Sequence, residues 1–308
     1  MQPEQDLKIY ELRALNAEAL EIFNDRTNLS RLGPALAGIH WETDFAFIFF
    51  KGQPGPGISE FLYDHPELDL KHIHELTYGQ WQDGAGAAPF EVQGLTITGP
   101  ECLETIKPQP GRNDEASQPG QGIAPVGMPN ADASRLIIDP GLAFGFGGHP
   151  TTHSCLEFLA RVCRAKSALP GTALDLGSGT GVLSLAAARW GILKVTGVDY
   201  SHLATDAALN NLRLNRLEGQ VEFVHGPAQN YARHPAELLM ANLHLSLQED
   251  LLKEGAFQER RAVIISGLLP SEGDSLLEKL TSLGLRLVDQ MRTERWITML
   301  LGPPGADF

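Results

Sequence analysis

The sequence predicts an α/β protein in which a small α/β sandwich precedes a mostly parallel sheet that ends in an antiparallel hairpin. From residue 134 on, short apolar runs alternate with helical patterns, which is typical of a parallel sheet with helices on both faces. Only a short polar stretch separates the last two apolar runs, which favours a hairpin. The first 78 residues follow the order strand, helix, strand, strand, helix, strand, as in a split α/β sandwich.

The small sandwich is predicted between Asp6 and about Tyr78. A helical stretch lies near Asn16 to Asn28, and Phe45 to Phe50 is rich in residues that favour strands. A short β segment is expected near Phe90 to Thr98.

A proline- and glycine-rich stretch separates the two halves of the chain. Residues 107 to 131 contain five prolines and four glycines and few apolar side chains, a composition that cannot pack a core. We therefore predict an N-terminal α/β domain at 1–99, a linker at 100–133 and a larger domain at 134–308.

The larger domain is predicted to contain six apolar β runs followed by the hairpin. The six runs are Arg135 to Ile138, Thr172 to Leu176, Lys194 to Asp199, Val221 to His225, Leu238 to Asn242 and Ala262 to Ser266. The hairpin is predicted from Leu285 to Asp289 and from Trp296 to Leu301, at the edge of the sheet.

The chain is acidic, with a formal net charge of −14. This charge repels phosphate backbones, so a nucleic acid is not expected as a direct partner. Residues 1–98 hold 15 acidic and 6 basic side chains, which suits a basic protein partner and equally suits plain solubility. The sequence implies no oligomer.

The three cysteines favour a reducing compartment. Cys102, Cys155 and Cys163 are odd in number and lack C-x-x-C spacing, so neither a disulfide framework nor a zinc site is indicated. The first ten residues have no apolar core of a signal peptide, and no apolar run is long enough to span a membrane. We therefore expect a cytoplasmic protein without a membrane partner and without a metal.

A glycine-rich loop follows the strand at Thr172 to Leu176. Gly177, Gly179 and Gly181 lie between that strand and an alanine-rich helix, where glycine allows close approach of the backbone to a ligand. The G-x-G-x-G spacing differs from the pattern that binds a pyrophosphate. The carboxylate of Asp175 would repel a pyrophosphate and attract a cationic, amino-bearing ligand such as S-adenosyl-L-methionine.

Two further polar residues end neighbouring β runs. Asp199 lies 22 positions after Gly177, where its carboxylate can accept both hydroxyls of a ribose. Asn242 ends another strand, and its amide can hold either a cofactor or an incoming amine. The alternative for Asn242 is a strand-ending turn, where asparagine is common.

A glycine-rich apolar segment precedes the first helix of the larger domain. It runs from Asp139 to Thr152 and contains Phe144 among its glycines, with Thr151 at the expected start of a helix. Such a loop can fold over a cofactor, and we expect Phe144 to line the path of the methyl acceptor together with Asn242.

Four blocks, taken in order and spacing, resemble the PrmA-type family of ribosomal protein L11 methyltransferases. They are D-P-G-L-A-F-G-F-G-G-H-P-T-T, L-D-L-G-S-G-T-G, V-D-Y and A-N-L. The resemblance implies a seven-stranded Rossmann-like catalytic domain of class I and a front domain that recognises the substrate. It also implies transfer of methyl groups from S-adenosyl-L-methionine to lysine side chains, and to the N-terminal amine, of the basic ribosomal protein L11.

By this resemblance, Thr151, Gly177, Asp199 and Asn242 occupy the positions that contact the cofactor in the family. Asp175, Gly179 and Gly181 join them through the glycine-loop argument given above.

Other functions remain open at this point. A methyltransferase of the same fold could act on another protein or a small amine. A silent protein that binds S-adenosyl-L-methionine without turnover is suggested by Phe146 and Gly148, which replace two threonines of the family's loop. NAD-dependent oxidoreduction is disfavoured by the loop spacing, and base methylation by the missing N-P-P-aromatic motif.

Three histidines of the larger domain are candidate functional groups. His244, two residues after Asn242, is either a proton acceptor or a histidine at the strand edge. His149 and His153 stand four apart, but no glutamate lies between them and no third ligand is apparent, so we expect no zinc there.

Overall fold

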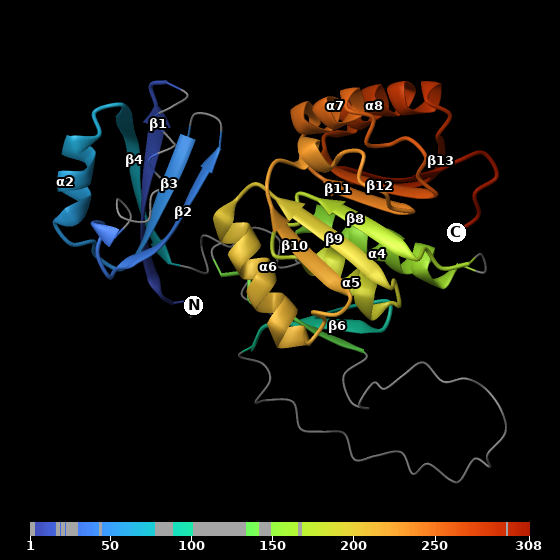
Figure 1. Ribbon diagram of the computed structural model, residues 1–308, viewed down its shortest axis with the longest axis horizontal. Helices are drawn as coiled ribbons and strands as arrows, with labels where there is room; N and C mark the ends of the chain where they lie inside the picture. Colours follow the sequence, from blue (N-terminus) through green and yellow to red (C-terminus); the bar gives the residue numbers. More distant parts are fainter. Residues whose placement is uncertain are drawn as a thin grey trace, which may run out of the picture.

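A computed structural model provides the structure of the protein (Figure 1). The predicted linker after residue 100, most of the predicted helix at Asn16–Asn28 and Phe144 lie outside the residues that it describes. The described residues are 4–16, 19, 22, 30–42, 45–77, 89–100, 134–141, 149–165, 168–293 and 295–308.

The larger domain is built on a seven-stranded sheet in the order β10-β9-β8-β11-β12-β14-β13. The first five strands in that order are parallel, and β14 and β13 form an antiparallel hairpin beside β12. The predicted mostly parallel sheet with a terminal hairpin is therefore confirmed. The strands are β8 (Thr172–Leu176), β9 (Lys194–Asp199), β10 (Val221–His225), β11 (Leu238–Asn242), β12 (Ala262–Leu268), β13 (Arg286–Arg292) and β14 (Ile297–Gly302).

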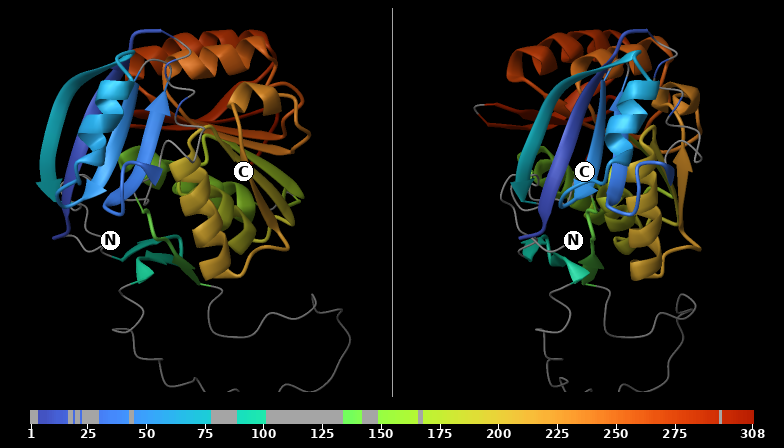
Figure 2. Two further views of the ribbon diagram at one scale, coloured as in Figure 1. Left: turned by 60° about the vertical axis from the view of Figure 1, so that its left-hand side comes forward. Right: turned by 90° about the vertical axis from the view of Figure 1, so that its left-hand side faces the viewer.

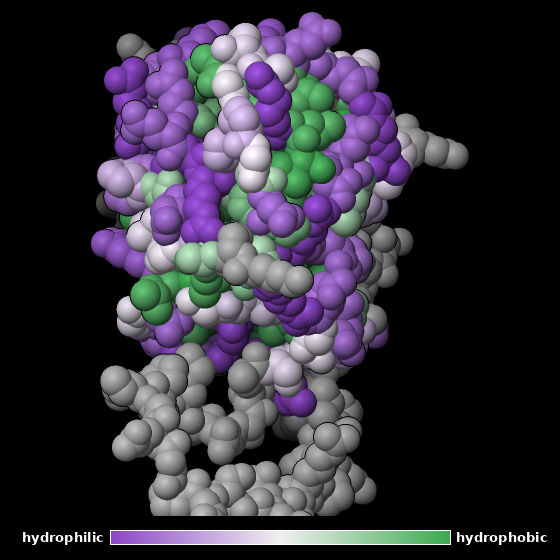
Figure 3. Space-filling model, turned by 90° about the vertical axis from the view of Figure 1, so that its right-hand side faces the viewer, coloured by the Kyte–Doolittle hydropathy of each residue, from purple (hydrophilic) through white to green (hydrophobic). Residues whose placement is uncertain are grey.

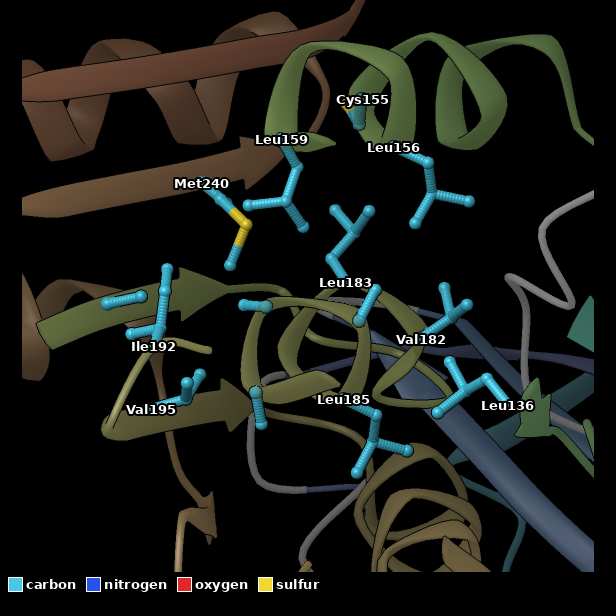
Figure 4. Packing of buried hydrophobic residues seen from close by; sticks show 14 of the residues in the cluster. Leu136, Cys155, Leu156, Leu159, Val182, Leu183, Leu185, Ile192, Val195 and Met240 are labelled. Atoms are coloured by element: carbon cyan, nitrogen blue, oxygen red, sulfur yellow. The ribbon is translucent and has the colours of Figure 1, made fainter. Parts of the chain in front are cut away.

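Helices cover both faces of this sheet, which is why its central strands are apolar on both sides. Leu174 and Leu176 of β8 pack in one buried cluster with residues of α7 and α8, whereas Ala173 packs in another with α4 and α5. Figure 4 shows Leu159 of α4 and Met240 of β11 close together in that second cluster. The helices are α4 (Pro150–Arg164), α5 (Val182–Arg189), α6 (His202–Asn215), the 3-10 helix η3 (Ala228–Tyr231), α7 (Leu245–Lys253) and α8 (Pro270–Ser282).

The N-terminal domain contains a four-stranded antiparallel sheet in the order β2-β3-β1-β4. Its elements are β1 (Asp6–Ala14), β2 (Leu36–Glu42), β3 (Phe45–Lys51), α2 (Gly57–Asp64) and β4 (Leu68–Thr77). One face packs on α2 through a buried cluster that includes Phe50 and Phe61. The other face carries a smaller apolar cluster of Leu7, Ile9 and Phe49.

The smaller apolar cluster is where the N-terminal domain meets the larger one. Leu203, in the first turn of α6, packs against that cluster, and α6 lies beside the blue strands of the small sheet in Figure 2. Leu76 of the edge strand β4 packs against the same cluster, but most residues of that strand are exposed. One face of the small sheet is thus only partly covered.

A third sheet joins the two sides of the predicted linker. Its strands are β5 (Phe90–Val92), β6 (Leu95–Thr98) and β7 (Arg135–Ile137). β6 pairs in parallel with β7, and Val92, Leu95 and Leu136 pack in the core of the larger domain. The domain boundaries at 1–99, 100–133 and 134–308 remain a prediction. The structure shows in addition that β6 and β7, on either side of the predicted linker, pair with each other.

The expectation that Arg135 to Ile138 belongs to the main sheet is wrong. β7 pairs with β6 only, because the side-chain amide of Asn215 occupies its other edge. Asn215 accepts a hydrogen bond from the amide of Ile137 (2.9 Å) and donates one to the carbonyl of Ile137 (2.6 Å). A side chain on α6 thus takes the place of a neighbouring strand.

Within the described part of the chain, no helix is both long and apolar enough to cross a membrane. The same residues contain no group of three or more histidine, cysteine or carboxylate side chains arranged for a metal ion. Figure 3 shows a face on which several green apolar areas lie among purple hydrophilic residues.

Candidate active site

The predicted site residues gather at the carboxyl edge of the main sheet. β8 lies between β9 and β11 in the strand order, and all three are parallel. Asp199 ends β9, Asn242 ends β11, and Gly177 directly follows β8. Because carboxyl ends of parallel strands meet at one edge, the glycine loop lies between Asp199 and Asn242.

The glycine loop is held against β9 by backbone hydrogen bonds. The amides of Gly177 and Ser178 both donate to the carbonyl of Val198, at 2.8 and 3.0 Å. Gly177, Gly179 and Gly181 all have positive φ angles, of 75°, 55° and 80°, which other residues adopt only with strain. The conformation itself therefore requires glycine at these positions.

Close packing adds a second requirement at two of these glycines. A Cβ on Gly177 would lie 2.3 Å from Cδ2 of Leu243, and a Cβ on Gly181 would lie 2.4 Å from Cζ of Phe223. The space beside these two glycines is thus filled by the protein's own side chains. Gly181 also caps the start of α5, so its contribution is to shape the loop.

Asp199 fixes the loop from the neighbouring strand. Its Oδ2 accepts the amide of Gly179 at 2.8 Å, and its Oδ1 accepts the amide of Ser201 at 2.9 Å. A carboxylate oxygen can accept more than one hydrogen bond. Both oxygens therefore retain the capacity to accept hydroxyl donors, as the predicted ribose contact requires.

Asp175 is buried, with 1% of its surface exposed. Ser184 Oγ donates to its Oδ2 at 2.6 Å, whereas its Oδ1 has no hydrogen-bond partner. Burial raises the pKa of this carboxyl to about 7, the hydrogen bond from Ser184 opposes the rise, and the nearby Asp199 adds to it. An unpartnered buried acceptor is costly, so the site suits a ligand that brings a donor or a positive charge.

Asn242 lies against the first turn of α4. Its Nδ2 donates to Thr151 Oγ1 at 3.2 Å and to Thr152 Oγ1 at 3.5 Å. Thr151 is also bonded to Nδ1 of His149, the N-cap of α4, at 2.7 Å between Oγ1 and Nδ1. The structure thus brings the predicted residues Asn242 and Thr151 together.

A group of aromatic rings beside Asp199 escaped the sequence analysis. The rings of His202 and His225 stack with centroids 3.6 Å apart and an interplanar angle of 12°. The centroid of the Tyr200 ring lies 6.3 Å from that of His225. His225 is paired with Asp199 in the register of β10 and β9. The signal in the sequence was that His225, like Asp199 and Asn242, is the last residue of a parallel strand.

Asn211 is a second residue that the sequence analysis missed. Its Oδ1 accepts the amide of Asp139 at 2.8 Å, and its Nδ2 donates to the carbonyls of Asp139 and Thr180. One buried amide therefore ties the start of the Asp139 segment to the glycine loop. The available signal was a pair of asparagines, Asn211 and Asn215, four residues apart on one helix face.

Gln248 braces the carboxyl edge from α7. Its Nε2 donates to the carbonyls of Ala241, Leu243 and Ser266, at 3.3, 2.9 and 2.8 Å. The side chain is fully buried, so these bonds hold the ends of β11 and β12 in place. His244 is the N-cap of α7 and bonds to Ser246.

The seven-stranded sheet, its terminal hairpin and the glycine loop at the carboxyl edge together define a domain with the class I methyltransferase fold. The crystal structure of ribosomal protein L11 methylase from Lactobacillus delbrueckii subsp. bulgaricus aligns with a TM-score of 0.50 and 24% sequence identity. The alignment covers 70% of this chain and 99% of that one, which shows the shared fold.

The family model described as "Ribosomal protein L11 methyltransferase (PrmA)" matches residues 124–302, more than half of the chain. The chain therefore belongs to this family, as the resemblance predicted. A protein of this name from Geotalea daltonii is 34% identical over 182 residues, covering 54% of this chain and 57% of that protein. One from Shewanella amazonensis is 35% identical over 153 residues, covering 49% and 50%. The chain thus spans only about half the length of the curated relatives it matches.

Proposed function

We propose that the protein is an S-adenosyl-L-methionine-dependent protein N-methyltransferase that modifies amines of ribosomal protein L11. One observation carries the proposal: the family match over residues 124–302 contains every predicted site residue, from Phe144 to Asn242. Relatives named for this activity align with 54% and 49% of the chain.

The residues at the carboxyl edge suit this cofactor. The orphaned Oδ1 of Asp175 provides an acceptor for a cationic amino group, and the oxygens of Asp199 provide acceptors for ribose hydroxyls. Gly179 contributes the backbone of the loop between them. When bound, the cofactor supplies an electrophilic methyl group on a sulfonium.

The protein's own part in the reaction is to hold and orient the methyl acceptor. Methyl transfer forms a nitrogen–carbon bond with the lone pair of a neutral amine, while the carbon–sulfur bond breaks and its electron pair stays on sulfur. A lysine amine has a reference pKa of about 10.4, so it must lose a proton before attack. We assign Asn242 to bind this amine through its side-chain oxygen and Phe144 to line its path; water receives the proton.

The acidic N-terminal domain supports a basic protein as substrate. Residues 1–98 carry 15 acidic and 6 basic side chains, a balance that attracts a basic partner at long range. We further propose that the protein acts in the cytoplasm without a direct contact to nucleic acid.

The test is the intact mass of purified ribosomal protein L11 after incubation with this protein and S-adenosyl-L-methionine. We expect mass increments of one or more methyl groups. Gly177→Arg is the control, because its side chain would clash with Leu243 and block the loop. Increments that persist in the control would contradict the assigned site.

Two alternatives are separated by the same samples. Titration calorimetry with S-adenosyl-L-methionine and with NAD identifies the cofactor. Cofactor binding without any methylation of ribosomal protein L11 would indicate another protein, a small amine or a silent binder. The residue substituted to test catalysis is Asn242: Asn242→Ala should reduce turnover, and full activity with unchanged cofactor affinity would contradict its role.

A further inference from the structure

A chain of polar contacts runs from the start of α4 to the end of β11. His149 Nδ1 lies 2.7 Å from Thr151 Oγ1, and Thr151 Oγ1 lies 3.2 Å from Asn242 Nδ2. Only 2% of Thr151 is exposed. Neighbouring protein groups, rather than water, therefore determine which atom donates in each hydrogen bond. The three side chains come from the N-cap of α4, its first turn and the carboxyl edge of the sheet.

The backbone determines which way the bonds run. His149 Nδ1 accepts a hydrogen bond from the backbone amide of Thr151 at 3.3 Å, and an amide can only donate. Nδ1 is therefore the unprotonated nitrogen of the ring. The hydroxyl of Thr151 must then donate its single proton to Nδ1, which leaves the lone pairs of Oγ1 to accept from Asn242.

This direction has a consequence for the amide of Asn242. Because Thr151 Oγ1 can only accept, the NH₂ group of Asn242 faces Thr151 and its Oδ1 occupies the other end of the amide. Among the described residues, Oδ1 of Asn242 has no hydrogen-bond partner. The amide thus presents an acceptor, which a neutral amine can use, rather than a second donor.

We propose that His149 is a positioning residue that, through the hydroxyl of Thr151, fixes the Asn242 amide with its oxygen toward the methyl acceptor. The inference rests on the proposed function, since it assigns the acceptor amine as the partner of Oδ1. Trp296 contributes by packing on the imidazole, with ring centroids 5.5 Å apart at 67°. Trp296 directly precedes β14 and takes part in neither hydrogen bond.

The first experiment measures the orientation of Asn242 without any substrate. In a ¹⁵N-labelled protein, the side-chain NH₂ signals of Asn242 are assigned by their loss in Asn242→Asp. We expect His149→Ala and Thr151→Val to shift these signals and to speed their exchange with water. His149→Asn should restore them, because an asparagine oxygen can accept from both the amide and the hydroxyl of Thr151. His153→Ala, one turn along the same helix, is the matched control and should leave them unchanged.

The second experiment measures turnover in the same variants with ribosomal protein L11 as substrate. We expect kcat to fall about 100-fold in His149→Ala, as misplacement of a positioning group can cause, with KM for S-adenosyl-L-methionine changed less than threefold. The double variant His149→Ala, Thr151→Val should have a kcat within twofold of Thr151→Val alone, because both act along one path. His149→Asn should recover most of the loss.

The outcomes separate this inference from the proposed function. If His149→Ala lowers the melting temperature but leaves both the Asn242 signals and kcat unchanged, His149 is only a helix cap and the proposal is wrong. If the signals shift together but the wild-type protein does not methylate ribosomal protein L11, the positioning role stands and the proposed substrate fails. If methylation occurs and the two single variants reduce kcat multiplicatively, the common path is refuted.

Discussion

The two sheets differ in where their strands end. In the seven-stranded sheet, five parallel strands bring their carboxyl ends to one edge, and there Asp199, His225 and Asn242 lie as last residues of their strands. In the antiparallel N-terminal sheet, neighbouring strands end at opposite edges. The last position of a parallel strand therefore predicts a site residue, whereas the same position in an antiparallel strand does not.

The two sheets also differ in how fully they are covered. Helices pack on both faces of the larger sheet, so a polar group such as Asp175 is deeply buried there. The small sheet has α2 on one face and only the partial contact with Leu203 on the other. Substitutions should therefore have larger effects in the parallel sheet than at the contact between the domains.

The largest effect is expected from Asp175→Asn, measured as the free energy of unfolding between pH 4 and 8. The pKa of Asp175 is about 7 in the folded protein, against 3.8 as its ordinary value. The folded state therefore binds more protons than the unfolded state between these values, and the wild-type protein loses stability as pH rises from about 4 to 7. Each pKa unit corresponds to about 1.4 kcal/mol, so Asp175→Asn should gain up to about 4 kcal/mol relative to wild type across this range.

Ser184→Ala tests the same group in the opposite direction, because it should raise the pKa of Asp175 further. It removes the hydrogen bond that favours the ionised carboxyl, so the loss of stability should extend to higher pH than in the wild-type protein. If the free energy of unfolding changes with pH in the same way in the wild-type protein and in Asp175→Asn, burial does not perturb the pKa of Asp175.

Gly177→Ala should have the next largest effect, because it combines strain with a clash. The positive φ of 75° costs about 1–2 kcal/mol for a residue with a Cβ, and displacing Leu243 adds about 1–3 kcal/mol. We expect unfolding by urea to show a loss of about 3 kcal/mol.

Gly284→Ala is the matched control for Gly177→Ala. It has a φ of 93° but nothing within 4 Å of the added Cβ, so it should cost about 1–2 kcal/mol. The difference between the two variants measures the packing beneath the glycine loop, and equal losses would mean that Leu243 moves aside freely.

The smallest effect is expected at the domain contact. Leu203 packs on Leu7, Ile9 and Phe49, and Leu203→Asp should destabilise that contact by about 1–2 kcal/mol, part of the value for a fully buried leucine. Hydrogen exchange followed by mass spectrometry should show faster exchange in β1 and β3. Leu214→Asp, on the same helix but 36% exposed, should not; equal exchange in both variants would contradict the contact.

Much of the fold and site could be predicted because the signals are local. The glycine loop, Asp199 and Asn242 each follow directly from the end of an apolar strand, and the hairpin from two strands with a short connection. The exception, Arg135 to Ile138, has the composition of a sheet strand but is paired by the side chain of Asn215. That partner is 78 residues away, and no local pattern reveals it.

The remaining features depend on contacts that periodicity does not report. The loss of solvent around Asp175 requires α4 and α5 to pack on β8, and the hydrogen bonds that His149 accepts require the N-cap geometry of α4. The spacing of His149 and His153 is visible in the sequence and draws attention to metal binding rather than to positioning. Thr151, the partner of His149, lies only two residues away, but the direction of that hydrogen bond is visible only in three dimensions.

The hydrogen bonds of Gln248 indicate when the carboxyl edge of the sheet can form during folding. Its amide bonds to carbonyls on both sides of α7, from Ala241 and Leu243 before the helix and from Ser266 after it. All three acceptors come together only when the crossover from β11 to β12 is complete, since a parallel pair has no tight turn to form it early. We therefore expect the edge that holds the site to be fixed late in folding, so that its hydrogen bonds slow unfolding rather than speed folding.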